Sequence, residues 1–98
     1  MAIQTINPAN NELIKTFEAH TTDQVEKKLK AANKAFRLWK DTNFGERARL
    51  MNRCAEILEQ EADTYGRIIT LEMGKPLKDS IAEIQKCAKV CRYYAENA

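Results

Sequence analysis

The sequence predicts an α+β fold that is mainly α, with an N-terminal β-hairpin followed by three to four amphipathic helices. Near the N-terminus, short runs of β-branched and aromatic residues flank a turn-forming segment. From residue 21 onward, apolar residues recur at steps of three and four, the period of a helix with one buried face. We therefore divide the chain into a hairpin region, residues 1–20, and a helical region, residues 21–98.

The hairpin is indicated by two apolar runs, residues 3–6 and 13–17, separated by the segment NPANN at residues 7–11. Asn and Pro favour turn conformations, whereas β-branched and aromatic residues favour strands. Two strands alone are only marginally stable in water. We therefore expect the hairpin to lie on a helix or to pair with the sheet of another chain.

Two capping signals mark the starts of helices. Thr21 with Gln24, and Asn43 with Glu46, have the spacing of a capping box. The apolar rhythm behind the second cap lasts for about thirty residues, which is long for a globular helix, so we expect a break near residues 60–63. A further helix should start between residues 76 and 80 and continue to Ala98. The pattern lacks the Gly, Asn or Pro that normally ends a helix, so we expect the chain to be cut from a longer protein.

The segment IITLEMGKPLKDS, residues 68–80, contains a Gly-Lys pair that invites comparison with a phosphate-binding loop. Such a loop needs a glycine five residues before the pair and a Ser or Thr after it, but Ile69 and Pro76 occupy these positions. Gly74 can instead close a helix in the left-handed conformation, and Pro76 can preset the first turn of the next one. We predict a helix stop and restart here.

Composition limits the classes of function. A chain of 98 residues forms one small domain, and its net charge of +2 is too small to imply a nucleic-acid partner. No apolar run reaches membrane length, and the N-terminal residues lack the layout of a secretory signal. The three irregularly spaced cysteines agree with a reducing compartment. We expect a cytoplasmic protein without a membrane partner.

The cysteines do not form a predicted site. Cys87 and Cys91 share one helix face, but a zinc site needs four ligands and the single histidine, His20, lies far away in a loop. With Cys54 they all fall in the middle of helices, away from the helix N-terminus or neighbouring histidine that would activate a thiolate. We predict no metal and no catalytic residue among them, and interpret them as small apolar side chains.

Two surface features remain open to a binding role. The first helix carries a basic stripe of Lys27, Lys30, Lys34 and Arg37. The stripe has no aromatic residue for base stacking, so a solvated face is favoured over a nucleic-acid site. Near the C-terminus Arg92, Tyr93 and Tyr94 offer a stacking patch, for which the edge of an amphipathic core is the favoured interpretation.

Four segments resemble a known family. INPANNELI, ERARLMNRCAEILEQEAD, ITLEMGKPLKDSIAEI and CRYYAENA are similar, in this order and spacing, to the N-terminal part of the aldehyde dehydrogenase superfamily. They look most like its bacterial succinate-semialdehyde dehydrogenase branch. One departure is the pair Asn10-Asn11, which stands where the family usually has a Gly in the hairpin turn. Asn also tolerates the left-handed conformation, so the turn is preserved.

The resemblance implies a much longer enzyme with an NAD(P)-binding domain, a catalytic domain and an oligomerisation hairpin. In that family a cysteine thiolate attacks the aldehyde, hydride leaves to the nicotinamide, and a glutamate-activated water hydrolyses the thioester. Those residues lie downstream of the matched region, so the resemblance implies no catalytic and no cofactor-binding residue in these 98 residues. Register with the family's RYYA motif places Lys86 near the entrance of the substrate tunnel.

Two functional hypotheses follow. The first is the N-terminal part of an NAD(P)-dependent aldehyde dehydrogenase that oxidises succinate semialdehyde in the full-length enzyme, inactive by itself and partnered by the rest of the chain. Apolar side chains left uncovered would then drive self-association, and we expect Trp39, Phe44, Ile81 and Ile84 among them. The alternative is an autonomous helical protein-interaction module that uses an apolar helix face or the basic stripe.

Overall fold

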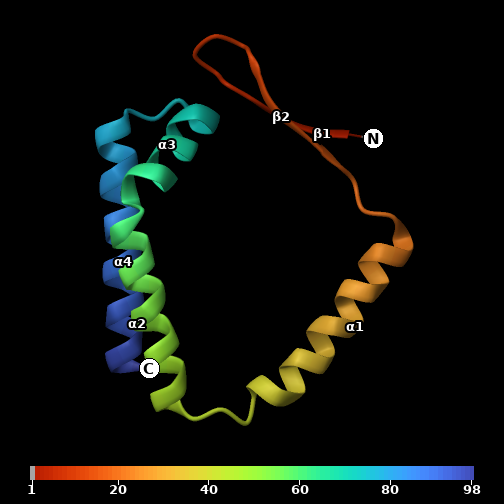
Figure 1. Ribbon diagram of the computed structural model, residues 1–98, viewed down its shortest axis with the longest axis vertical. Coiled ribbons are helices and arrows are strands. Elements are labelled where there is room, and N and C mark those ends of the chain that lie inside the picture. Colours follow the sequence, from red (N-terminus) through yellow and green to blue (C-terminus); the bar gives the residue numbers. More distant parts are fainter. Residues whose placement is uncertain (1) are drawn as a thin grey trace.

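The computed structural model, which describes residues 2–98, contains one two-stranded antiparallel hairpin followed by four helices (Figure 1). The elements are β1 (Ala2–Ile6), β2 (Leu13–Glu18), α1 (Thr22–Trp39), α2 (Phe44–Gln60), α3 (Ala62–Met73) and α4 (Leu77–Asn97). This order confirms the predicted α+β, mainly α fold.

The hairpin forms where the sequence predicts it. β1 pairs with β2 so that Ile3 lies opposite Phe17, and a bulge follows Thr5. In the turn, Asn11 has a φ of 62°, which confirms that Asn supplies the left-handed position. The side-chain oxygen of Asn7 accepts a hydrogen bond from the backbone N–H of Ala9 at 3.0 Å, which holds the turn. β2 is exposed along its whole length, whereas β1 contacts α3 at the end of that helix.

The helix boundaries follow local signals. Thr21 and Gln24 form the predicted capping box, with both reciprocal hydrogen bonds present. Asn43 caps α2 by accepting a hydrogen bond from the backbone N–H of Glu46 at 2.8 Å. The long apolar pattern breaks at Glu61, where φ is −110° and ψ is 22°, so α2 and α3 are separate helices. The break lies inside the predicted range of residues 60–63.

Gly74 ends α3 as predicted. Its φ of 74° lies in the left-handed region, and its N–H donates to the carbonyl of Thr70 at 3.0 Å. Pro76 stands one position earlier than expected: it is the N-cap of α4, and its carbonyl accepts from the backbone N–H groups of Asp79 and Ser80. A rigid φ at that position still directs the chain into the helix.

The buried residues gather where α2 and α3 pack along α4. Ala55 and Ala88 are fully buried, and the Ser80 hydroxyl, also fully buried, hydrogen-bonds the Thr70 hydroxyl at 3.0 Å. At the α3–α4 contact, Gly66 lets the two helices approach so closely that an added Cβ would lie 2.8 Å from Ile81 Cγ1. Small side chains therefore set the spacing of these three helices.

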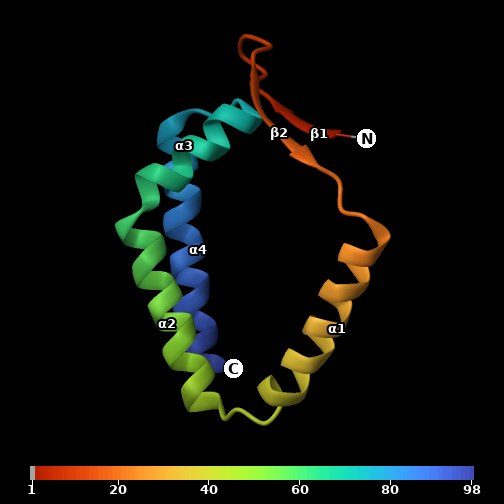
Figure 2. The same cartoon turned by 45° about the vertical axis from the view of Figure 1, so that its right-hand side comes forward.

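The elements form an open ring rather than a packed globule. Both views show α1 running opposite the α2–α4 pair, with the hairpin and the α1–α2 turn closing the two ends (Figures 1 and 2). The radius of gyration is 17.5 Å. A compact chain of this length would have about 13 Å. The exposed area of 8050 Å² likewise exceeds the roughly 5,700 Å² expected for a folded monomer of 11.2 kDa.

Large apolar side chains are consequently left uncovered. No residue of α1 is buried, and Leu29, Trp39 and Phe44 are 65%, 46% and 68% exposed. The expectation that these side chains are uncovered is correct for Trp39 and Phe44 but wrong for Ile84, which is buried on α4, the helix against which α2 and α3 pack. Ile81 is half-buried against Gly66. Within residues 2–98, no helix is long and apolar enough to cross a membrane.

The close approach at Gly66 predicts an unusual response to alanine. Gly66→Ala should lower the free energy of unfolding by about 1–3 kcal/mol, because the new methyl group overpacks against Ile81 side-chain and backbone atoms. Gly45→Ala is the matched control: its nearest atom lies at 3.4 Å, and alanine favours the helix, so stability should stay constant or rise by up to about 1 kcal/mol. Urea denaturation of both variants measures this, and equal stability would contradict the overpacking.

Candidate functional site

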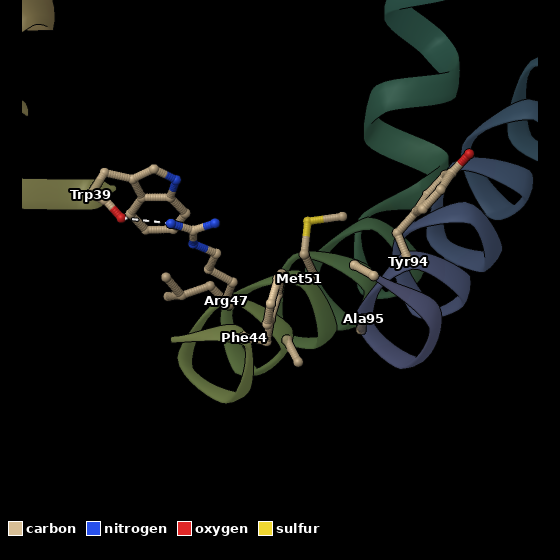
Figure 3. Close-up of a pocket in the computed structure, with 9 residues that line it drawn as sticks. Trp39, Phe44, Arg47, Met51, Tyr94 and Ala95 are labelled. Carbon is tan, nitrogen blue, oxygen red and sulfur yellow. Dashed lines mark hydrogen bonds between the residues drawn. The ribbon is translucent and has the colours of Figure 1, made fainter. Parts of the chain in front are cut away.

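An apolar cavity of about 350 Å³ lies where the α1–α2 turn meets the last turn of α4 (Figure 3). Its lining comes from three elements and the turn between two of them: Trp39, Phe44, Arg47, Ala48, Leu50, Met51, Tyr94, Ala95 and Ala98. Figure 3 shows Met51 and Phe44 on α2 between Trp39 on one side and Tyr94 on the other.

Arg47 is the one charged side chain of this lining. Its guanidinium donates to the Trp39 carbonyl at 2.8 Å and to the Lys40 carbonyl at 3.3 Å, while Nε donates to Thr42 Oγ1 at 2.7 Å. The guanidinium also lies 5.4 Å from the centre of the Trp39 ring, within range of a cation–π contact.

These contacts satisfy backbone groups that α1 cannot satisfy itself. The last carbonyls of a helix have no intrahelical partner and carry its partial negative charge. Thr42 adds a further bond, because its hydroxyl donates to the same Trp39 carbonyl at 2.7 Å. Arg47 and Thr42 therefore fasten the end of α1 to the start of α2, and they fix the Trp39 ring at the edge of the cavity.

The cavity is better suited to apolar side chains than to a reacting substrate. The donors of Arg47 are already directed at carbonyls of the chain, and the remaining lining is aliphatic, aromatic or a thioether. A catalytic site needs an acid, base or nucleophile that can reach the bound molecule. This lining offers hydrophobic contact and shape instead.

Lys86 lies on α4, exposed, and lines none of the cavities found among the described residues. It is two positions from both Ile84 and Ala88, which places it on the side of α4 opposite the α2–α3 contact. Its ammonium group makes no hydrogen bond or ion pair with other residues in the range 2–98.

The three cysteines are in mid-helix, as predicted, and all are free thiols. Cys54 lies on α2, and Cys87 and Cys91 lie on α4. Burial raises the pKa of the Cys91 thiol, and the influence of Cys54 raises it further. This is the opposite of the shift that activates a nucleophile. Among residues 2–98, no cluster of three ligating side chains is arranged for a metal ion.

The three glycines have structural tasks. Gly74 stops a helix, Gly66 permits close packing, and Gly45 lies in the first turn of α2. A dinucleotide is usually held by glycines in a strand–turn–helix unit of a parallel sheet. The sheet within residues 2–98 is an antiparallel hairpin and does not contain a unit of this kind.

The remaining charged contacts lie on the surface. Glu61 accepts a hydrogen bond from the Tyr65 hydroxyl at 2.6 Å, which raises the pKa of Tyr65, and Asp63 raises the pKa of Arg67 in the same way. Exposed pairs of this kind contribute little to stability. The basic stripe is exposed with the whole of α1. Tyr93 and Tyr94 contact each other edge-to-face and are both more than half exposed.

Sequence reasoning missed three contacts that position this region: Arg47 with the end of α1, Gly66 with Ile81, and Thr70 with Ser80. Each joins residues from different elements. Only one signal was available for them in the sequence, a glycine inside an otherwise helical pattern at position 66, which often marks a packing contact.

Comparison with known proteins identifies the relatives of this fold. The model of the aldehyde dehydrogenase family matches residues 1–98. The chain is 50% identical, over all its residues, to an NADP(+)-dependent succinate-semialdehyde dehydrogenase of Mycobacterium tuberculosis, of which it covers 21%. It is 44% identical to a probable NADP(+)-dependent succinate-semialdehyde dehydrogenase of Synechocystis, of which it covers 22%. The chain thus spans about a fifth of the length of these relatives and matches their N-terminal region.

A solved structure agrees. Succinic semialdehyde dehydrogenase from Streptococcus pyogenes, in complex with NADP+, superposes with a TM-score of 0.89 at 32% identity. The match covers 95% of this chain and 21% of that one. The open arrangement of hairpin and helices is therefore shared with a larger enzyme.

The role given to Arg47 predicts a local effect on the single tryptophan. Arg47→Ala should loosen the end of α1, raise acrylamide quenching of Trp39 fluorescence and cost about 1 kcal/mol of unfolding free energy. Arg49→Ala, on the same helix but without a contact to Trp39, is the control and should leave the quenching unchanged. Equal quenching in the two variants would show that Arg47 does not hold the ring.

Proposed function

Because the chain belongs to the aldehyde dehydrogenase family, we propose that it is the N-terminal part of an NADP-dependent enzyme that oxidises succinate semialdehyde to succinate. The observation that carries this proposal is the 50% identity, over the whole chain, to a succinate-semialdehyde dehydrogenase that uses NADP(+). The reaction requires a cofactor and a catalytic thiolate, which we assign to residues outside these 98.

In this proposal the chain has a scaffolding role. Its uncovered apolar surface, from Leu29 and Trp39 on α1 to Phe44 on α2, packs against the remaining four-fifths of the enzyme. The large exposed area supports this, because contiguous apolar patches of this extent are usually covered by a partner. The proposed division into residues 1–20 and 21–98 agrees with the gap between β2 and α1. An autonomous interaction module is not favoured, since an independent domain closes its own core.

Two further parts of the proposal concern the cellular compartment and the place of Lys86 relative to the substrate. We place the enzyme in the cytoplasm, which the three free thiols support. We also place Lys86 at the entrance for the substrate. Its exposed ammonium, unpaired within residues 2–98, would attract the carboxylate that distinguishes succinate semialdehyde from uncharged aldehydes.

An exchange of segments tests the function. Replacing the matching region of the Mycobacterium tuberculosis relative by residues 1–98 should give an enzyme that reduces NADP(+) with succinate semialdehyde, whereas the chain alone should bind no NADP(+) in calorimetric titration. The hybrid carrying Gly66→Ala is the control for packing of the exchanged segment. It should be less stable than the unsubstituted hybrid, because the new methyl group overpacks the α3–α4 contact. In the hybrid, Lys86→Ala should raise KM for the substrate about tenfold, with kcat unchanged.

A folded hybrid without activity would contradict the assignment, and saturable NADP(+) binding by the chain alone would contradict the placement of the cofactor site elsewhere. A KM unchanged by Lys86→Ala would remove Lys86 from the substrate entrance while leaving the function intact.

The bare apolar surface predicts self-association of the isolated chain. Two copies should meet through helix faces at a symmetric contact that buries at least about 1,000 Å². Sedimentation over a wide range of concentrations measures this, with a shift from monomer to dimer expected. Phe44→Ser, at a residue 68% exposed, should weaken the dimer, while Lys27→Ser on the basic stripe should not. A strictly monomeric chain would show that the helices need no partner surface.

A further inference from the structure

The apolar cavity between the α1–α2 turn and α4 lies where the described chain ends. Ala98, the last residue, is itself part of the lining, together with Tyr94 and Ala95 of α4. α4 runs antiparallel to α2, so this end of α4 lies beside the start of α2 in both views (Figures 1 and 2). A residue joined to Ala98 would therefore begin at the wall of the cavity.

The other walls are mainly apolar side chains that water now reaches. Trp39, Phe44 and Tyr94 are each about half exposed or more, and Met51 lies between Trp39 and Tyr94 (Figure 3). Apolar surface gains free energy when it is covered. An apolar cavity of roughly 150 Å³ can hold a benzene ring, so about 350 Å³ has room for about two large side chains.

The spacing of the lining residues on α4 shows which residues would come next. Tyr94, Ala95 and Ala98 lie on one helix face, because they recur within one helical turn. On a helix that continues, the third and fourth residues after Ala98 lie on this same face. Side chains on a helix lean back towards its N-terminus, which directs these two over the cavity.

The backbone of α4 stays helical up to this point. The N–H of Ala98 donates to the carbonyl of Tyr94 at 3.1 Å, which is the bond of a regular α-helix. Within residues 2–98, a positive φ occurs at Asn11 and Gly74, so no left-handed residue interrupts the last turn of α4. A helical continuation is therefore compatible with the described backbone.

We propose that the next turn of α4 occupies this cavity. In the full-length protein the helix continues beyond Ala98, and the side chains of the third and fourth residues after it pack among Trp39, Phe44 and Met51. This inference rests on the proposed function, which makes the chain part of a protein about five times as long. It names the segment that covers this part of the exposed apolar surface.

An attached segment is favoured over a second copy of the chain. A segment joined to Ala98 is held beside the cavity at an effective concentration of about millimolar or more, whereas a second copy must bind from solution. The polar groups of the cavity select no other partner, because Arg47 donates to the carbonyls of Trp39 and Lys40. The cavity therefore fits apolar side chains delivered by its own helix.

Two designed extensions of the 98-residue chain test the geometry. Each adds about two helical turns of alanine and lysine after Ala98, with two leucines. The first extension has its leucines at the third and fourth added positions, facing the cavity. The matched control has them at the second and fifth positions, on the opposite face.

Trp39 is the single tryptophan of the chain and lines the cavity, so its fluorescence reports on the occupant. The first extension should roughly halve the acrylamide quenching constant of Trp39 and raise the midpoint of urea unfolding, because the leucines cover the ring. The control extension should leave the quenching close to that of the unextended chain. Both are compared at the same dilute concentration, so that their equal apolar content cancels any effect of self-association.

The natural continuation is tested in the hybrid with the Mycobacterium tuberculosis relative. Serine at the third and fourth residues after Ala98 should lower the thermal midpoint of the hybrid, and Met51→Ala should lower it as well. Because both changes remove the same contact, the loss in the combined variant should be smaller than the sum of the separate losses. With Arg49→Ala, which lies outside the cavity, in place of Met51→Ala, the losses should add.

Equal quenching with the two extensions, or additive losses with Met51→Ala, would overturn the proposal. Equal protection of Trp39 by both extensions that grows with chain concentration would make a second copy the occupant, and would overturn it too. None of these measurements uses dehydrogenase activity. A folded but inactive hybrid with non-additive losses would thus contradict the enzyme assignment and still support this occupant of the cavity.

Discussion

The contact of α3 and α2 with α4 is the constraint on which the rest of the structure depends, because the buried residues of the described chain gather there. Gly66 lies against Ile81, and the alanines at positions 55 and 88 let α2 approach the same helix. The remaining elements are attached to this unit at its ends: the hairpin turn meets α3 where Pro8 approaches Gly74, and α1 is fastened to α2 by Arg47. Loss of the central contact would remove the support of both.

Helix α1 shows that a helix can be specified locally without being part of a core. Its capping box, its apolar stripe and its fastened C-terminal end are all present, yet no residue of it is buried. Most helix stability in proteins comes from packing of the apolar face, and α1 lacks that packing. The apolar face of α1 thus has the residue pattern of a buried surface, but no partner covers it among the described residues. This agrees with the greater length of the relatives, which are about five times as long.

Signals within one element allowed the starts and ends of the helices to be predicted, from the cap at Thr21 to the left-handed stop at Gly74. Contacts between elements were not predictable in the same way. Ile84 was expected to be uncovered because the rest of the longer enzyme, which covers such helices, is absent, but the sequence does not say which face of α4 the neighbouring helices already bury.

The polar side chains of residues 2–98 mainly hold helices and turns together, and few of them are free to contact a substrate. The Arg47 guanidinium donates to the carbonyl at the end of α1, and the Ser80 hydroxyl hydrogen-bonds the Thr70 hydroxyl. The glycines lie at turns and close contacts between elements. A catalytic group must keep a donor, acceptor or lone pair free for a substrate. Among the three cysteines, burial raises the pKa of the Cys91 thiol, which is the opposite of the shift that would activate it for attack on an aldehyde.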